Sequence, residues 1–81
     1  MRYSVQIRAA RALLGMKQEE LAKASKTGLA TIQRIEQGEG LIQANYSTVL
    51  KIQSALEKAG VTFIDANGEI GAQVDEKRLT K

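Results

Sequence analysis

The chain has 81 residues, with 12 basic and 9 acidic side chains and a formal net charge of +3 at neutral pH. Its length indicates one small domain, and its lack of cysteine and histidine excludes disulfides, thiolate zinc sites and imidazole chemistry. The mild positive charge permits nucleic acid as a partner without indicating it, and no apolar run approaches the roughly 20 residues that span a membrane.

The first predicted helix covers Val5–Leu14. Ser4 is its expected N-cap, because a serine hydroxyl can accept a hydrogen bond from a backbone N–H of the first turn. Gly15 occupies the position of a left-handed C-cap. The apolar side chains that recur here at helical spacing are Ile7, Ala10 and Leu14.

Two shorter helical patterns follow. The first begins at Lys17 or Gln18 and ends near Ser25. The second covers Leu29–Gln37 and stops at Gly38. Because only a few turn-forming residues separate them, the two helices must cross at a steep angle. This geometry leaves the outer face of the second helix open, and such a face can enter the major groove of DNA.

The fourth predicted helix is the longest and covers Tyr46–Ala59. The loop before it, Glu39–Asn45, carries Leu41 and Ile42, and we expect both side chains to point inward. Asn45, the last residue of this loop, is the expected N-cap. The apolar stripe of the helix comprises Val49, Ile52 and Leu56.

After residue 60 the apolar period changes from helical to two, which predicts β-strands. Asn67–Gly68 is a strong signal for a type I′ hairpin turn. We therefore divide the chain into a helical domain (1–60), a hairpin (61–74) and a charged tail (75–81) that we expect to be frayed. Pairing across the turn gives three opposed pairs on one, mostly apolar face: Val61 with Val74, Phe63 with Ala72, and Asp65 with Ile70.

Residues Arg11–Gly38 resemble the helix-turn-helix of the lambda-repressor-like, XRE-type family of bacterial and phage regulators. The resemblance rests on the segments Met16–Ala22 and Ala30–Gly38, in which a glutamine opens the second helix and isoleucines recur in the third. It implies a mainly α fold, a lambda-repressor-like bundle of four helices, followed here by a C-terminal β-hairpin. The chain departs from the family pattern at Lys26, where glycine is usual, and at Gly28, where a serine or threonine cap is usual.

The exposed side of the third helix supplies the candidate base contacts. Gln33 can form two hydrogen bonds with adenine, and Arg34 can do the same with guanine. Leu29 and Ala30 can contact thymine methyl groups. The alternative interpretation is an ordinary solvated helix face on which Leu29 is half-buried.

The resemblance implies that Gln18 holds a DNA phosphate and braces the side chains of the third helix. The alternative is that Gln18 is only a favourable residue for a first helical turn. Glu39 would oppose binding if it lies at the DNA edge. Five further residues are weaker candidates for phosphate contacts: Lys17, Lys26, Gln37, Gln43 and Asn45.

The resemblance also implies an interior salt bridge between Arg11 and Glu36, which would tie the end of the first helix to the end of the third. The alternative is two exposed charges. A buried pair of this kind serves to fix the orientation of the third helix more than it stabilises the fold.

Taken together, these features predict a sequence-specific DNA-binding transcriptional regulator, a dimeric repressor of its own or a neighbouring bacterial, plasmid or phage promoter. Two alternatives stay open: an antitoxin of a toxin–antitoxin operon, and an antiactivator that binds protein and no longer binds DNA. We expect a cytoplasmic protein without enzymatic activity, metal, cofactor or membrane contact. The expected partners are a palindromic DNA operator, a second copy of the chain and, in the alternatives, another protein.

The hairpin is the expected dimer interface. Its apolar face needs a cover, and the unpaired edges of its strands can recruit other strands. The residues expected at the interface are Val61, Phe63, Ile70 and Val74.

Overall fold

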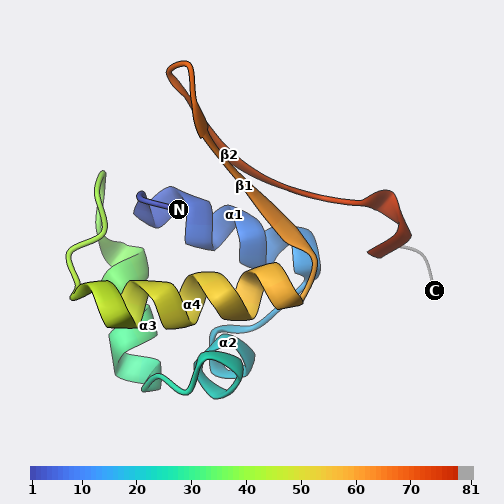
Figure 1. The fold of residues 1–81 in the computed structure, drawn as a ribbon. Coiled ribbons are helices and arrows are strands. Elements are labelled where there is room, and N and C mark those ends of the chain that lie inside the picture. The colour runs from blue at the N-terminus through green and yellow to red at the C-terminus, as the bar shows by residue number, and fades with distance from the viewer. Residues whose placement is uncertain (79–81) are drawn as a thin grey trace.

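The computed structural model describes residues 1–78, which form four helices followed by a two-stranded antiparallel hairpin (Figure 1). This order of elements agrees with the expectation from the sequence. Within the described part of the chain, no helix has the length and apolar character needed to cross a membrane. The elements are α1 (Ser4–Leu14), α2 (Gln18–Ser25), α3 (Leu29–Gln37), α4 (Tyr46–Lys58), β1 (Val61–Ala66), β2 (Glu69–Val74) and a short 3-10 turn, η1 (Glu76–Arg78).

One apolar core joins all four helices to β1. Burying a large aliphatic side chain contributes about 1.5–3 kcal/mol, so the helices hold one another in a fixed arrangement. The buried apolar residues are Ile7, Ala10, Leu21, Ala22, Ile32, Ile35, Ile52, Ala55, Leu56 and Val61.

The start of α1 differs from the expectation. The helix begins at Ser4 rather than Val5, with Tyr3 as the N-cap residue. Ser4 does not cap the helix, because its buried hydroxyl donates to the carbonyl oxygen of Ile35 at 2.8 Å. Gln6 satisfies the free backbone groups instead: its Oε1 accepts hydrogen bonds from the N–H groups of Arg2 and Tyr3, at 2.8 and 3.0 Å. Ser4 therefore connects α1 to α3.

The loop between α3 and α4 differs from the expectation at Leu41. Ile42 is partly buried against the core, but Leu41 is 55% exposed. Leu41 forms an isolated antiparallel bridge with Tyr3, and the Ile42 N–H donates to the carbonyl oxygen of Arg2 at 2.9 Å. Because neighbouring side chains of an extended chain point to opposite sides, the inward position of Ile42 turns Leu41 to the solvent.

Helix α4 begins at the predicted residue and ends one residue earlier than predicted. Asn45 caps this helix, because its Oδ1 accepts a hydrogen bond from the Thr48 N–H at 2.9 Å. The helix ends at Lys58, with Ala59 as the C-cap. The tail was expected to be frayed from Asp75 onwards, whereas η1 forms a helical turn there, supported by a 3.0 Å hydrogen bond from the Lys77 N–H to the Asp75 carboxylate. The rest of the tail, residues 79–81, lies outside the described residues.

The turn that joins α2 to α3 contains a left-handed residue that is not glycine. Lys26 has φ 56° and ψ 42°, and its N–H donates to carbonyl oxygens of the last turn of α2. A side chain in this conformation costs about 1 kcal/mol relative to glycine. The departure from the family pattern at Lys26 therefore introduces backbone strain into the turn.

We predict that Lys26→Gly raises the free energy of unfolding by about 0.5–1 kcal/mol, because glycine adopts the left-handed conformation without a steric penalty. For a domain of this size the melting temperature, followed by circular dichroism, should rise by about 2–8 °C. Lys26→Ala is the matched control, since it removes the same charge but keeps a Cβ. An equal gain for both variants would attribute the effect to the lysine charge.

The hairpin has the predicted register and packs on α1. Val61 pairs with Val74, and the turn residues Asn67 and Gly68 both have positive φ, 56° and 75°. The buried Gln6 amide anchors both strands, because its Nε2 donates to the carbonyl oxygens of Ile64 and Gly71.

Much of the apolar face of the hairpin is covered within the same chain. Val61 belongs to the core, whereas Phe63, Ala72 and Val74 are partly buried against it. Ile70 is 42% exposed. The need for an external cover is therefore smaller than the sequence suggested.

The start of the chain is also attached to the hairpin. The α-amino group of Met1 lies 3.0 Å from Oδ2 of Asp65, and Nε of Arg2 lies 3.6 Å from Oδ1. Burial alone would raise the pKa of Asp65, but the hydrogen bond from the α-amino group and the charge of Arg2 lower it below its usual value. The hairpin is thus held at its base by the core and along its length by polar contacts.

Candidate nucleic-acid interface

The turn between α2 and α3 starts with short hydrogen bonds at the C-terminal end of α2. The Thr27 N–H donates to the carbonyl oxygen of Ala22 at 2.9 Å, and the buried Ser25 hydroxyl donates to that of Leu21 at 2.7 Å. Gly28 is the N-cap of α3 in an extended conformation. Figure 1 shows α3 at the edge of the bundle, beside α2. One side of α3 therefore stays open.

The two sides of α3 differ sharply in burial. Ile32, Ile35 and Glu36 are buried, as the helical spacing predicts for the two isoleucines. The four residues expected to contact bases are all exposed, including Leu29 at 37%: Leu29, Ala30, Gln33 and Arg34. The open side of α3 thus presents the side chains that the sequence assigns to base recognition.

A buried ion pair fixes the end of α3. Arg11 donates from Nε and Nη2 to the two carboxylate oxygens of Glu36, both at 2.6 Å, and from Nη1 to the carbonyl oxygen of Met16 at 2.9 Å. Glu36 is only 4% exposed. The hydrogen bond to Glu36 raises the pKa of Arg11, against the opposing effect of burial. The interior salt bridge is therefore present, and the interpretation as two exposed charges is wrong.

Gln18 joins this ion pair to the exposed side of α3. Its Nε2 donates to Oε1 of Glu36 at 3.3 Å. Gln33 and Gln37 of α3 line the same hollow, together with Arg8 and Arg11. Three glutamines and two arginines thus lie around the Glu36 carboxylate beside the exposed side of α3. Their N–H groups are hydrogen-bond donors of the kind that phosphates and base edges accept.

Arg8 also lines this hollow, and the sequence interpretation did not single it out. Its Nη1 donates to the carbonyl oxygens of Glu36 and Gly38 at the end of α3. The available signal was its spacing, because residues three apart on a helix share a face. Arg8 stands three positions before Arg11, which the resemblance had already directed toward the third helix.

The loop before α4 supplies a second flank of α3. Arg34 donates to the carbonyl oxygen of Gln43 at 3.4 Å, so Gln43 lies beside Arg34, whereas Gln18 shares a hollow with Gln33 and Gln37. Asn45 uses its carbonyl oxygen to cap α4, which leaves its amide nitrogen as the group that can donate to a phosphate. Glu39 is exposed in the same loop.

The two lysine candidates lie apart from each other. Lys17 is exposed at the N-cap of α2, next to Gln18. Lys26 lies at the other end of α2, where it lines a hollow with Lys51 and Lys58 of α4. The structure therefore brings Lys17 close to the Gln18 flank and places Lys26 in a separate basic cluster.

Helices α2 and α3 pack together through the core, a short turn joins them, and α3 keeps an exposed, largely polar face. These features define a DNA-binding helix-turn-helix domain. Residues 7–62 match the model of the Helix-turn-helix family, over most of the chain from α1 to the first residues of β1. The chain belongs to this family, the XRE or lambda-repressor-like helix-turn-helix proteins. A comparison with curated proteins gives no match. The lambda-repressor-like fold expected from the sequence is confirmed, and most of the hairpin lies beyond the matched residues.

Proposed function

We propose that this helix-turn-helix protein is a sequence-specific transcriptional repressor that binds a palindromic operator as a homodimer, with one α3 in the major groove of each half-site. The observation that carries the proposal is the open face of α3, whose polar side chains stand beside Gln18 and are fixed by the buried Arg11–Glu36 pair. A fixed helix is what discrimination between base pairs requires, because each hydrogen bond must reach a defined base edge.

The four side chains on this face have separate roles. Gln33 forms a bidentate contact with adenine. Arg34 releases the Gln43 carbonyl oxygen and binds guanine. Leu29 and Ala30 contact thymine methyl groups, which explains why apolar side chains stand at the exposed start of α3.

The phosphates are bound on the two flanks of α3. On one flank the donors are Lys17, Gln18 and Gln37, and on the other they are Gln43 and the amide nitrogen of Asn45. Lys26 adds a longer-range positive charge. These contacts set the register of the protein on DNA but carry no sequence information. Repression then follows from occupancy of the operator, which blocks access to an overlapping promoter.

Gln33→Ala tests the proposal. We predict that it weakens binding to the specific operator by about 1–3 kcal/mol, relaxes the preference at one base position and leaves binding to random DNA nearly unchanged. Fluorescence anisotropy with operator and random duplexes measures both affinities at one salt concentration.

Gln73→Ala is the matched control, because Gln73 is also an exposed glutamine but lies on β2. It should leave both affinities unchanged. If Gln33→Ala weakens operator and random DNA equally, Gln33 is a backbone contact. If the wild-type protein binds neither duplex, the antiactivator alternative replaces the proposal.

A further inference from the structure

Arg8 supplies the net charge of the hollow beside Gln18. This hollow has a volume of about 500 Å³, and all the residues that line it are polar: Arg8, Arg11, Gln18, Gln33, Glu36 and Gln37. Because Arg11 is paired with Glu36 at 2.6 Å, the charge of Arg8 is the one that the lining leaves uncompensated. The hollow is therefore suited to an anionic group.

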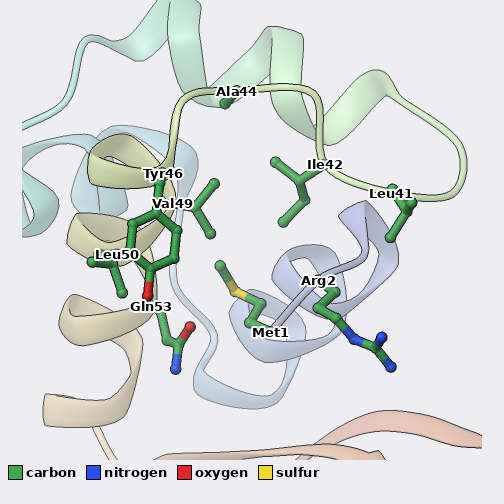
Figure 2. Close-up of a pocket in the computed structure, with 9 residues that line it drawn as sticks. All are labelled: Met1, Arg2, Leu41, Ile42, Ala44, Tyr46, Val49, Leu50 and Gln53. Atoms are coloured by element: carbon green, nitrogen blue, oxygen red, sulfur yellow. The ribbon is translucent and has the colours of Figure 1, made fainter.

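The other arginine near the start of the chain has a different environment. Arg2 lines a mostly apolar hollow between the chain start and α4 (Figure 2), and its Nε lies 3.6 Å from Oδ1 of Asp65. Arg8, in contrast, forms no salt bridge with a carboxylate among residues 1–78, and its side chain is exposed. Its charge is therefore available to a ligand.

One nitrogen of Arg8 is held by the end of α3. Nη1 donates to the carbonyl oxygens of Glu36 and Gly38, whereas Nε and Nη2 make no hydrogen bond within residues 1–78. Nε and Nη2 form the edge of a guanidinium that matches two oxygens of a carboxylate or a phosphate. Arg11 uses this same edge on Glu36, with both N···O distances 2.6 Å. The contact through Nη1 thus fixes the Arg8 guanidinium and leaves its anion-binding edge unused.

We propose that this edge of Arg8 binds a phosphate of the DNA backbone while Nη1 stays on the end of α3. The inference rests on the proposed function and adds to it a phosphate contact from α1. Gln18 and Gln37, the phosphate donors proposed on the same flank of α3, line the same hollow. One guanidinium then joins the DNA backbone to the end of α3, which sets the position of this helix in the major groove.

The position of Arg8 also removes an obstacle to phosphate binding. The last carbonyl groups of a helix together carry about half a negative elementary charge, which repels a phosphate. Arg8 covers carbonyl oxygens at this end of α3 with a positive charge. Because the guanidinium is already held in place, it also loses little side-chain freedom when it binds.

Arg8→Met in the full chain tests the inference, with a duplex of random sequence as the probe. Such a probe is sufficient because a phosphate contact does not depend on base sequence. Each neutralised phosphate contributes about 0.9 to the slope of log K against log salt concentration. The variant should therefore lower the magnitude of this slope by about 0.9 and weaken binding about eightfold at roughly 0.1 M salt. Fluorescence anisotropy over a series of salt concentrations measures both quantities.

Two further variants separate the phosphate contact from a structural role of Arg8. Arg8→Gln keeps an N–H donor for the end of α3 but removes the charge, so its slope should fall as much as that of Arg8→Met. Arg8→Lys keeps the charge and should retain the wild-type slope. Circular dichroism checks that each variant is folded.

Lys51→Met is the matched control, because it removes one positive charge from an exposed side chain of α4. It should leave the slope unchanged. A wild-type slope in Arg8→Met and Arg8→Gln overturns the inference, and so does an equal fall in Lys51→Met. These results would leave the proposed function standing. A wild-type protein that binds random duplexes through Arg8 but selects no sequence would refute the proposed function alone, and one that binds no duplex would refute both.

Discussion

Arg11→Met is expected to lower the free energy of unfolding by about 3–5 kcal/mol, because it leaves a buried carboxylate without its partner. Glu36 is 4% exposed and would keep the hydrogen bond from Gln18. Glu36→Gln should cost less, about 1–3 kcal/mol, because Arg11 is 21% exposed and keeps its hydrogen bond to Met16. Urea denaturation followed by circular dichroism measures both losses.

The double variant Arg11→Met/Glu36→Leu separates the ion pair from its surroundings. Because it removes both charges together, its loss in free energy of unfolding should be about 2 kcal/mol smaller than the summed losses of the single variants Arg11→Met and Glu36→Leu. Arg34→Met, an exposed arginine replaced in the same way, should change stability by less than about 0.5 kcal/mol. Two small and additive losses at Arg11 and Glu36 would contradict the role of this pair in fixing α3.

Truncation after Gly60 is expected to unfold most of the domain, although the removed residues lie almost entirely beyond the family match. Val61 is 3% exposed in the core, and the partly buried Phe63 is lost with it. The loss of this burial costs on the order of 3–5 kcal/mol, which is a large fraction of the roughly 5–15 kcal/mol that stabilises a small domain. The buried Gln6 amide also loses both of its carbonyl partners on the hairpin.

Truncation after Val74 is the matched control, because it removes only the tail and keeps both strands. Its thermal unfolding should follow that of the full chain. A fragment of residues 1–60 that melts cooperatively at the temperature of the full chain would show that the helices need no support from the hairpin.

Local sequence signals determined most of the secondary structure. The apolar period of 3.6 placed the helices, with α3 at the predicted Leu29–Gln37 and α1 and α4 within a residue of expectation. Asn67–Gly68 fixed the register of the hairpin, because a two-residue turn leaves one pairing that keeps the apolar side chains on one face. The resemblance alone predicted the Arg11–Glu36 ion pair, because no local sequence pattern indicates that either charge is buried.

Contacts between distant segments account for what the sequence did not predict. Gln6 interrupts the apolar face of α1 as a polar residue, and its burial depends on the backbone of a hairpin almost sixty residues away. The exposure of Leu41 follows from the pairing of its backbone with Tyr3. Arg8 binds the end of α3 only because α1 and α3 pack together. No periodicity within one element encodes such contacts.

Selection from a pool of random duplexes by the wild-type protein measures whether the open face of α3 reads the sequence of DNA. Sequencing of the bound pool is predicted to show one enriched palindrome, with the centres of its half-sites one helical turn, about 34–36 Å, apart. The Gln33→Ala protein should enrich the same palindrome with the preference lost at one position of each half-site. A bound pool with the composition of the starting pool would show that α3 does not read the sequence of DNA.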